Sequence, residues 1–155
     1  MKAVVQRVTS AAVTVDANII GEIKNGFLVF LGIAPGDTQA DAQKLADKIA
    51  RLRVFADENG KMNRSVLDVD GSILVISNFT LYADCRHGCR PPFTHSARPN
   101  DAQPLYEYFM QMLKQAGVKN VSAGQFGADM QVALVNDGPV TLVLDTAELM
   151  GKRSG

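Results

Sequence analysis

The sequence predicts one α+β domain in which antiparallel or mixed β-sheet layers pack against two amphipathic helices. Three observations predict this fold class. Segments rich in β-branched residues fill the opening quarter and return near the end, two stretches place apolar residues at helical spacing, and no linker or internal repeat divides the chain. The 155 residues, of which 46% are hydrophobic, suit a single domain with a substantial core.

The charge balance and the cysteines narrow the classes of function. Sixteen basic residues balance sixteen acidic ones, so nucleic-acid binding would have to rest on a local patch. No apolar run reaches the roughly 20 residues of a membrane span, and the N-terminal segment does not have the form of a signal peptide. Cys85 and Cys89 are too close together in the sequence for a disulfide between them to stabilise the fold. We therefore expect a cytoplasmic protein with no membrane partner.

The opening quarter predicts a β-meander. Residues 2–8 and 11–16 form short strands, and residues 18–23 and 27–33 follow as a hairpin around the turn at 24–26. The last of these segments begins with five apolar residues in a row. We therefore expect it to be a central strand that is covered on both faces.

Two stretches predict amphipathic helices. Asp37 or Thr38 caps the first, and Asp101 caps the second, which carries Pro104 in its first turn and ends at Gly117. Their apolar residues recur every three or four positions and predict faces that pack on the sheet. The apolar stripe of the first helix consists of Ala42, Leu45, Ala46, Ile49 and Leu52, and that of the second of Leu105, Tyr106, Phe109, Met112, Leu113 and Ala116.

The remaining chain predicts shorter elements. Residues 54–55 read as a short strand, 57–61 as a turn and 61–71 as a loop, while 72–76 read as a second core strand and 118–123 as a further short strand.

The segment Asn136–Thr141 lies between two apolar stretches, 130–135 and 142–144, that read as strands. One interpretation is a tight hairpin turn, since Asn, Asp, Gly and Pro are the residues of turns. The other is a rigid recognition element. Its carbonyl groups could hold a ligand ammonium, or it could block a side chain of the wrong chirality. Residues 146–155 predict a short helical turn and a frayed tail.

Ser77–Leu81 follows the second core strand and is the stretch most suited to chemistry. It carries two hydroxyl groups, an amide and an aromatic ring. Such a strand end can offer hydrogen-bond donors to a carbonyl group, with Phe79 packing on a base or ribose. The alternative interpretation is that the strand simply continues.

The irregular stretch at 84–99 is the most basic part of the chain. Arg86, Arg90 and Arg98 either contact phosphate groups or form a solvated surface. The only histidines, His87 and His95, also lie there, and no Gly-x-Ser-x-Gly elbow accompanies them, which argues against a serine triad.

A metal site is not expected in the same stretch. Cys85, His87 and Cys89 supply three ligands of a structural zinc site, and a fourth is missing unless His95 joins them. We interpret the two cysteines as incidental thiols, and we expect neither a metal nor a cofactor.

Several segments together resemble the D-aminoacyl-tRNA deacylases, formerly called D-tyrosyl-tRNA deacylases. The likeness covers residues 1–145, and the Asn-x-Gly-Pro-Val-Thr motif at 136–141 is matched in full. The family motif Ser-Gln-Phe-Thr-Leu appears with Asn78 as its second residue, which keeps the amide on a side chain one methylene shorter. The other matching segments are 1–8, Phe55 with 60–63, 90–91, 105–106 with Phe109, and 128–132.

The resemblance implies a homodimer that hydrolyses the ester between a D-amino acid and the 3′ end of tRNA, and that also acts on glycyl-tRNA. Phe79 and Thr80 would be the catalytic residues. Gly138 and Pro139, joined by a cis peptide bond, would act in the partner subunit as a chiral filter. Their carbonyl groups would clamp the substrate ammonium, and an L side chain would clash with the filter. The residues that would bind the substrate are Ser77, Asn78, Ala102, Met130, Gly138 and Pro139.

The chemistry expected from this resemblance needs no strong base. An aminoacyl ester is already activated, so the 2′-hydroxyl of the tRNA would help to activate water while backbone donors near Phe79 and Thr80 polarise the carbonyl group. We interpret Thr80 as a positioning residue, because the sequence offers no base to activate it. Two alternatives are a nucleic-acid-binding dimer without enzymatic activity and a related editing deacylase for misattached L-alanine.

Overall fold

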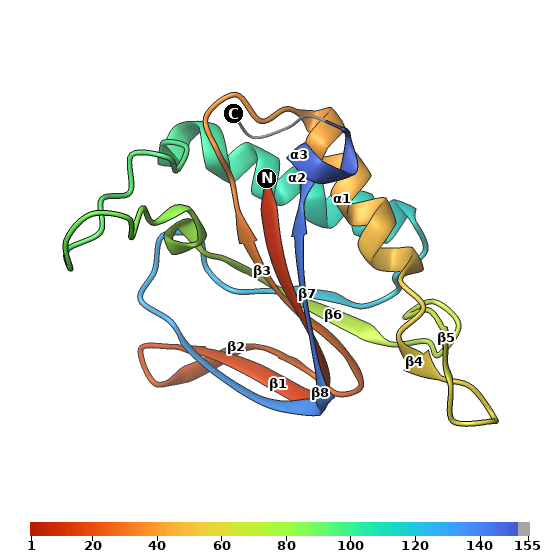
Figure 1. Cartoon of the computed structure of the whole chain (residues 1–155). Coiled ribbons are helices and arrows are strands. Elements are labelled where there is room, and N and C mark those ends of the chain that lie inside the picture. Colours follow the sequence, from red (N-terminus) through yellow and green to blue (C-terminus); the bar gives the residue numbers. More distant parts are fainter. Residues whose placement is uncertain (152–155) are drawn as a thin grey trace.

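The structure, a computed structural model, describes residues 1–151 as one α+β domain with a mixed sheet (Figure 1). The fold class predicted from the sequence is confirmed. In chain order the elements are β1 (Lys2–Val15), β2 (Asn18–Ile23), β3 (Gly26–Gly32), α1 (Gln39–Arg51), β4 (Phe55–Ala56), β5 (Met62–Arg64), β6 (Ser72–Ser77), the 3₁₀ helix η1 (Phe79–Tyr82), α2 (Pro99–Gln115), β7 (Val121–Ala123), β8 (Gln131–Asp145) and α3 (Thr146–Leu149).

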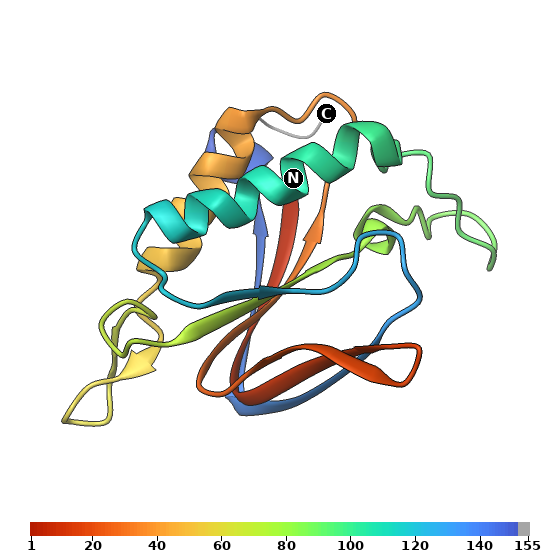
Figure 2. The ribbon, with the colours of Figure 1, turned by 180° about the vertical axis from the view of Figure 1, so that it is seen from behind.

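The sheet is organised around β1. Its strand order is β2-β1-β3-β6-β7, and β8 pairs with β1 as well. The strands β2, β3 and β8 run antiparallel to β1, whereas β3, β6 and β7 run parallel to one another. Both β1 and β8 bend, so that β2 and the strand halves beside it fold under the rest of the sheet (Figures 1 and 2).

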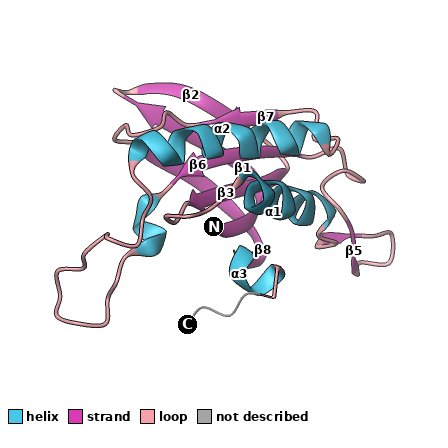
Figure 3. Ribbon diagram, turned by 90° about the horizontal axis from the view of Figure 1, so that it is seen from above, coloured by secondary structure: helices cyan, strands magenta, loops and turns pink. Residues whose placement is uncertain are grey.

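The bent sheet encloses two cores. Helices α1 and α2 cover one face of the sheet (Figure 3), and the larger core lies between them and the strands. The smaller core lies on the other face, where β2 and the second half of β1 fold over. Strand β3 serves both, because Phe27, Val29 and Leu31 point into the larger core and Leu28 into the smaller one. The prediction of a central strand covered on both faces is confirmed.

The predicted β-meander is wrong. Strand β1 is continuous where two short strands were expected. Strands β2 and β3 do not pair with each other, and both pair with β1, β2 opposite residues 11–15 and β3 opposite residues 2–8. Residues 24 and 25 therefore link β2 to β3 along one edge of β1, and the hairpin turn is at Asp16 and Ala17, which both have positive φ. The predicted loop at 61–71 is wrong in part, since Met62–Arg64 pairs with β4.

Both amphipathic helices are present. Thr38 caps α1 in a capping box with Asp41. Burial favours a raised pKa for Asp41, but hydrogen bonds from Thr38 outweigh it and hold that pKa below its usual value. The predicted cap of α2 is wrong: the N-cap is Arg98, three residues before Asp101, and the helix begins at Pro99, because proline is pre-organised for the first helical position. Consequently Asp101 lies in the first turn and Pro104 lies beyond it.

The ends of the described chain meet beside α1. The Met1 ammonium is buried, lies 2.9 Å from Asp37 Oδ2 and donates a hydrogen bond to Thr146 Oγ1 at 3.0 Å. The predicted short helical turn is α3, whereas the rest of the predicted tail, 152–155, lies outside the described residues. No helix within residues 1–151 is long and apolar enough to cross a membrane.

Replacing Asp37 with alanine is expected to lower the free energy of unfolding by about 3 kcal/mol, because it leaves a buried ammonium without its carboxylate. Urea unfolding measures this loss. The control is Asp47→Ala, which breaks an exposed pair with Arg51 at 3.1 Å and should change the free energy of unfolding by less than about 1 kcal/mol. Equal losses in the two variants would contradict the prediction.

Candidate active site

An apolar cavity of about 420 Å³ opens beyond the carboxyl ends of the parallel strands β3 and β6, a position where open α/β sheets commonly bind ligands. It brings together five residues that were predicted as site residues from three separate parts of the chain: Ser77, Asn78, Phe79, Ala102 and Met130. The other residues that line it are Leu31, Ile33, Phe93, Ser96, Ala97, Pro99, Phe126, Gly127 and Ala128.

The wall of the cavity is formed by η1. Strand β6 ends at Ser77, so the alternative of a continuing strand is wrong. Asn78 donates its N–H to the carbonyl oxygen of Leu31 at 2.8 Å, and its side-chain oxygen caps η1 by accepting from the Thr80 N–H at 3.2 Å. The same oxygen accepts from the Thr80 hydroxyl. The short Asn78 side chain is therefore engaged within the wall, and it occupies the Thr80 N–H.

The Phe79 N–H differs from that of Thr80. As the first residue of η1, Phe79 has no acceptor for its N–H within the helix. Among the hydrogen bonds formed by residues 1–151 outside regular helices and strands, none has this N–H as its donor. The wall therefore offers one backbone donor beside the cavity.

Aromatic rings form the rim of the cavity. Phe79 is 59% exposed, and its ring meets that of Phe93 edge to face, with the ring centroids 5.1 Å apart. Ser96 Oγ donates to the carbonyl oxygen of Phe79 at 2.6 Å, which ties the loop before α2 to η1. Tyr106, whose ring centroid lies 5.8 Å from that of Phe126, donates its hydroxyl to the carbonyl oxygen of Val75 at 2.9 Å, and burial raises its pKa to about 12. Tyr106 is thus a neutral structural donor at neutral pH.

The Gly138-Pro139 pair lies in the middle of β8. The predicted hairpin is wrong, because Gln131–Asp145 is one strand that pairs with β1 along its length. The pairing passes from Thr141 opposite Gln6 to Asn136 opposite Val8, so residues 137–140 bulge outward opposite Arg7 alone. Gly138 and Pro139 are exposed, and the peptide bond between them is cis.

A polar network holds this bulge. The Arg7 guanidinium donates through Nε to the carbonyl oxygen of Asp137 at 3.1 Å and lies 3.3 Å from the Asp137 carboxylate. It also donates to the carbonyl oxygen of Val54. Asn136 Nδ2 donates to the carbonyl oxygens of Arg7 and Val140 at 3.1 and 3.0 Å. The bulge is therefore held by hydrogen bonds on both flanks.

Three predicted site residues do not line the cavity: Thr80, Gly138 and Pro139. The two halves of the predicted site, the wall at η1 and the Gly138-Pro139 pair, are therefore not joined within one chain. Within residues 1–151 strand β8 pairs only with β1, which leaves its outer edge without a neighbouring strand. That edge carries Val135 and Val143, which are 56% and 74% exposed.

Sequence reasoning missed the roles of Arg7 and of the loops that close the cavity. Arg7 is a charged residue between the buried Val5 and Val8, and such a residue in an apolar strand is a signal that it has a specific partner. The signals for the loops were weaker. Phe93 and Phe126 are aromatic residues in irregular stretches, a position that often serves binding.

The basic stretch lies beside the cavity. Asp84 pairs with Arg86, whose hydrogen bonds hold the pKa of the Asp84 carboxyl well below its usual range, and His95 Nε2 lies 3.7 Å from the same carboxylate. Cys85 and Cys89 are free and exposed. Among the residues that the structure describes, no group of three or more His, Cys, Asp or Glu side chains is placed to hold a metal ion.

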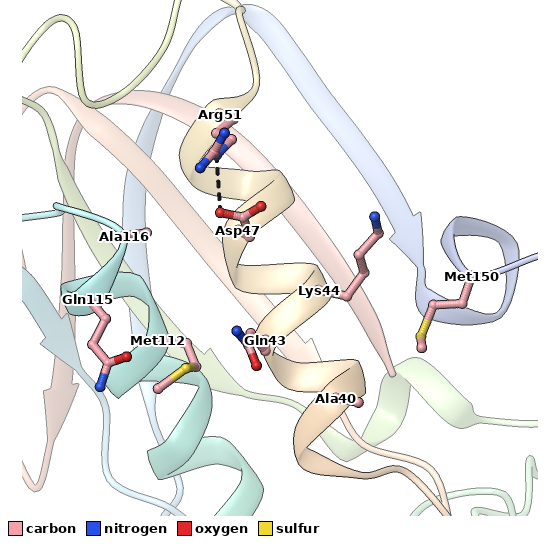
Figure 4. A pocket seen from close by; sticks show the side chains of 9 residues that line it. All are labelled: Ala40, Gln43, Lys44, Asp47, Arg51, Met112, Gln115, Ala116 and Met150. Carbon is pink, nitrogen blue, oxygen red and sulfur yellow. Dashed lines mark hydrogen bonds and ion pairs between the residues drawn. The ribbon is translucent and has the colours of Figure 1, made fainter.

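A larger, open hollow of about 640 Å³ lies elsewhere, between α1, α2 and Met150 (Figure 4). It is lined by Ala40, Gln43, Lys44, Asp47, Arg51, Met112, Gln115, Ala116 and Met150, none of which was predicted from the sequence as a site residue. Its polar lining includes the Arg51–Asp47 pair, so the cavity beside η1 is the better candidate for binding an acyl ester.

Comparison with known proteins finds similar sequences over almost the whole chain. The family model described as D-Tyr-tRNA(Tyr) deacylase matches residues 4–145. A protein of Roseiflexus castenholzii named D-aminoacyl-tRNA deacylase is 57% identical over 147 residues, which cover 95% of this chain and 93% of that protein. A protein of the same name from Thermus aquaticus is 56% identical, with 99% of this chain and all of that protein covered.

Two solved structures resemble the whole fold. One, named c-Myc DNA Unwinding Element Binding Protein, superposes with a TM-score of 0.88 at 43% identity, covering 94% of this chain and 98% of that one. The other, a probable eukaryotic D-amino acid tRNA deacylase, superposes with a TM-score of 0.79 at 14% identity, covering 92% and 97%, and this likeness concerns the fold alone.

Proposed function

Since the chain belongs to the D-aminoacyl-tRNA deacylase family, we propose that it hydrolyses the ester joining a D-amino acid to the 3′-terminal adenosine of tRNA. The same activity extends to glycyl-tRNA, because glycine presents no side chain to reject. The observation that carries the proposal is the free Phe79 N–H beside an apolar cavity that Ser77, Ala102 and Met130 also line. Release of amino acid from D-tyrosyl-tRNA by the purified chain is the experiment that tests it.

The cavity suits an acyl ester held by few polar contacts. Phe79 at the rim offers its ring to the terminal adenine, and the Phe79 N–H donates to the ester carbonyl oxygen, where negative charge develops during attack by water. Water adds to the carbonyl carbon, the bond to the ribose 3′-oxygen breaks, and that oxygen takes up a proton. The neighbouring 2′-hydroxyl of the tRNA helps to activate the water, so no side chain acts as a strong base.

Thr80 serves this arrangement by positioning the wall. Its hydroxyl and its N–H both donate to the Asn78 side chain, and no histidine, carboxylate or lysine is hydrogen-bonded to it within residues 1–151. A hydroxyl without a base is a poor nucleophile. Thr80 therefore orients η1 and forms no acyl intermediate.

Replacing Thr80 with alanine is expected to lower kcat on D-tyrosyl-tRNA by no more than roughly tenfold, because one neutral hydrogen bond within the wall contributes about 1 kcal/mol. Single-turnover hydrolysis measures the effect, with tRNA binding measured beside it as the control. A complete loss of turnover with tRNA binding intact would make Thr80 the nucleophile and would contradict this assignment.

Rejection of L-amino acids is assigned to Gly138 and Pro139 acting in the partner subunit of a homodimer. Two observations support this: the pair is exposed and does not line the cavity of its own chain, and β8 has a long free edge with exposed valines. A two-fold axis beside that edge would bring each bulge to the other cavity. There the two carbonyl groups hold the substrate ammonium, and an L side chain points into the bulge and clashes with it.

A second candidate function is binding of duplex DNA without ester hydrolysis. The observation that favours it is that the structural neighbour at 43% identity is named as a DNA unwinding element binding protein. The zero net charge of the chain weighs against it. This function predicts duplex DNA binding that weakens steeply with salt and no release of amino acid from any aminoacyl-tRNA. A deacylase for misattached L-alanine, the third alternative, predicts faster hydrolysis of L-alanyl-tRNA than of D-tyrosyl-tRNA.

A further inference from the structure

Residues 85–91 form a basic finger that stands beside the mouth of the cavity. In Figure 1 the loop between η1 and α2 extends away from the body of the domain. Its base is closed by the Asp84 N–H, which donates to the carbonyl oxygen of Pro92 at 3.0 Å. Directly after this closure, Phe93 and Ser96 line the cavity. A ligand that leaves the cavity on this side therefore passes the finger.

The charge of the finger is positive and exposed. Arg86 and Arg90 are both exposed, and the one carboxylate nearby in sequence is Asp84 at the base. That carboxylate already binds Arg86, with Nε and Nη2 each at 2.9 Å from its oxygens. Among the ion pairs formed within residues 1–151, none includes Arg90. The finger thus presents one guanidinium that is fixed and partly neutralised and one that is free of carboxylates.

We propose that the basic finger binds backbone phosphates of the tRNA nucleotides that precede the 3′-terminal adenosine, with Arg90 as the principal ligand. The proposal rests on the proposed function, because it places the terminal adenosine at Phe79. The nucleotides next to the adenosine must then leave through the mouth, where a guanidinium can donate two hydrogen bonds to one phosphate. Contacts to phosphate carry no base specificity, so the finger supports binding of many tRNAs alike.

The test compares Arg90→Gln with wild type on two substrates: D-tyrosyl-tRNA and D-tyrosine esterified to adenosine alone. On the tRNA we expect KM to rise roughly tenfold with kcat unchanged, because one charge-assisted contact is lost. The dependence of log KM on log salt should also become shallower by about 0.7 to 0.9. On the adenosine ester, which has no such phosphates, neither constant should change. The control is Arg51→Gln on α1, which should behave as wild type on both substrates.

Unchanged KM and salt dependence on tRNA, or an equal rise in KM on the adenosine ester, would overturn the proposal. Failure of the proposed function is a different result, since wild type would then cleave neither substrate. In that case binding of uncharged tRNA tests the role of the finger. A Kd for tRNA raised roughly tenfold in Arg90→Gln would support the phosphate contact, and a Kd equal to that of wild type would overturn it.

Discussion

Replacing Phe79 with proline is expected to lower kcat on D-tyrosyl-tRNA by roughly 100- to 1000-fold relative to replacing it with alanine. Both variants lose the aromatic ring, and only proline also removes the N–H that we assign to the ester carbonyl. The first position of a helix tolerates proline, and the extended backbone of Asn78 (φ −146°, ψ 92°) avoids the helical conformation that a following proline disfavours. The ratio of the two variants therefore isolates one backbone donor.

The measurement is single-turnover hydrolysis with saturating enzyme, so that weaker binding from loss of the ring does not enter the comparison. Thermal unfolding and oligomeric state are compared between the two variants to show that both are folded alike. Equal kcat values for Phe79→Pro and Phe79→Ala in well-folded proteins would exclude the Phe79 N–H as the group that stabilises the transition state.

The second large effect is expected for Gly138→Ala. Gly138 has a φ of +134°, where residues with a side chain are strained, and an added Cβ would lie 2.8 Å from both the N and the Cγ2 of Val140. The bulge must therefore shift. A displacement of about 1 Å can change a rate roughly 100-fold, so we expect the preference for D-tyrosyl-tRNA over L-tyrosyl-tRNA to fall by about that factor.

The matched control is Gly60→Ala. Gly60 also has positive φ, at +77°, but an added Cβ meets nothing within 4 Å, and the residue lies in the turn before β5. It also places a side chain at positive φ, but without a collision, and should leave discrimination unchanged. If Gly138→Ala retained wild-type discrimination with its fold and oligomeric state unchanged, the bulge would not be the chiral filter.

The elements that the sequence predicted well are those whose signals are local. The apolar run beginning at Phe27, the segment 72–76 and the spacing of Leu45, Ala46 and Ile49 depend only on neighbours in the chain, and β3, β6 and α1 follow them closely. The resemblance carried by 136–141 is also local in sequence, and membership of the family is confirmed.

The errors come from long-range pairing. Asn136–Pro139 has the composition of a turn, but its course is set by β1, far earlier in the chain, which pairs with β8 on both sides of the bulge. The same strand pairs with β2 and β3 one after the other, so the predicted hairpin between them does not form. Patterns within a short window do not specify which strands become neighbours.

In the candidate site, too, local signals were predicted and long-range contacts were missed. Ser77–Thr80 could be selected because a polar segment follows a buried strand, and Ala102 and Met130 came from the family resemblance. The partners Phe93, Ser96 and Phe126 reach the cavity only through the course of two loops, which no local pattern specifies. Arg7 could be placed only by seeing which carbonyl groups it meets across the sheet.

The most direct test of the central claim is release of amino acid from D-tyrosyl-tRNA, L-tyrosyl-tRNA and glycyl-tRNA by the purified protein under identical conditions. The proposed function predicts fast loss of the D-tyrosyl and glycyl esters and a spared L-tyrosyl ester. Hydrolysis of neither enantiomer by folded, dimeric protein would contradict it and would favour the nucleic-acid-binding alternative.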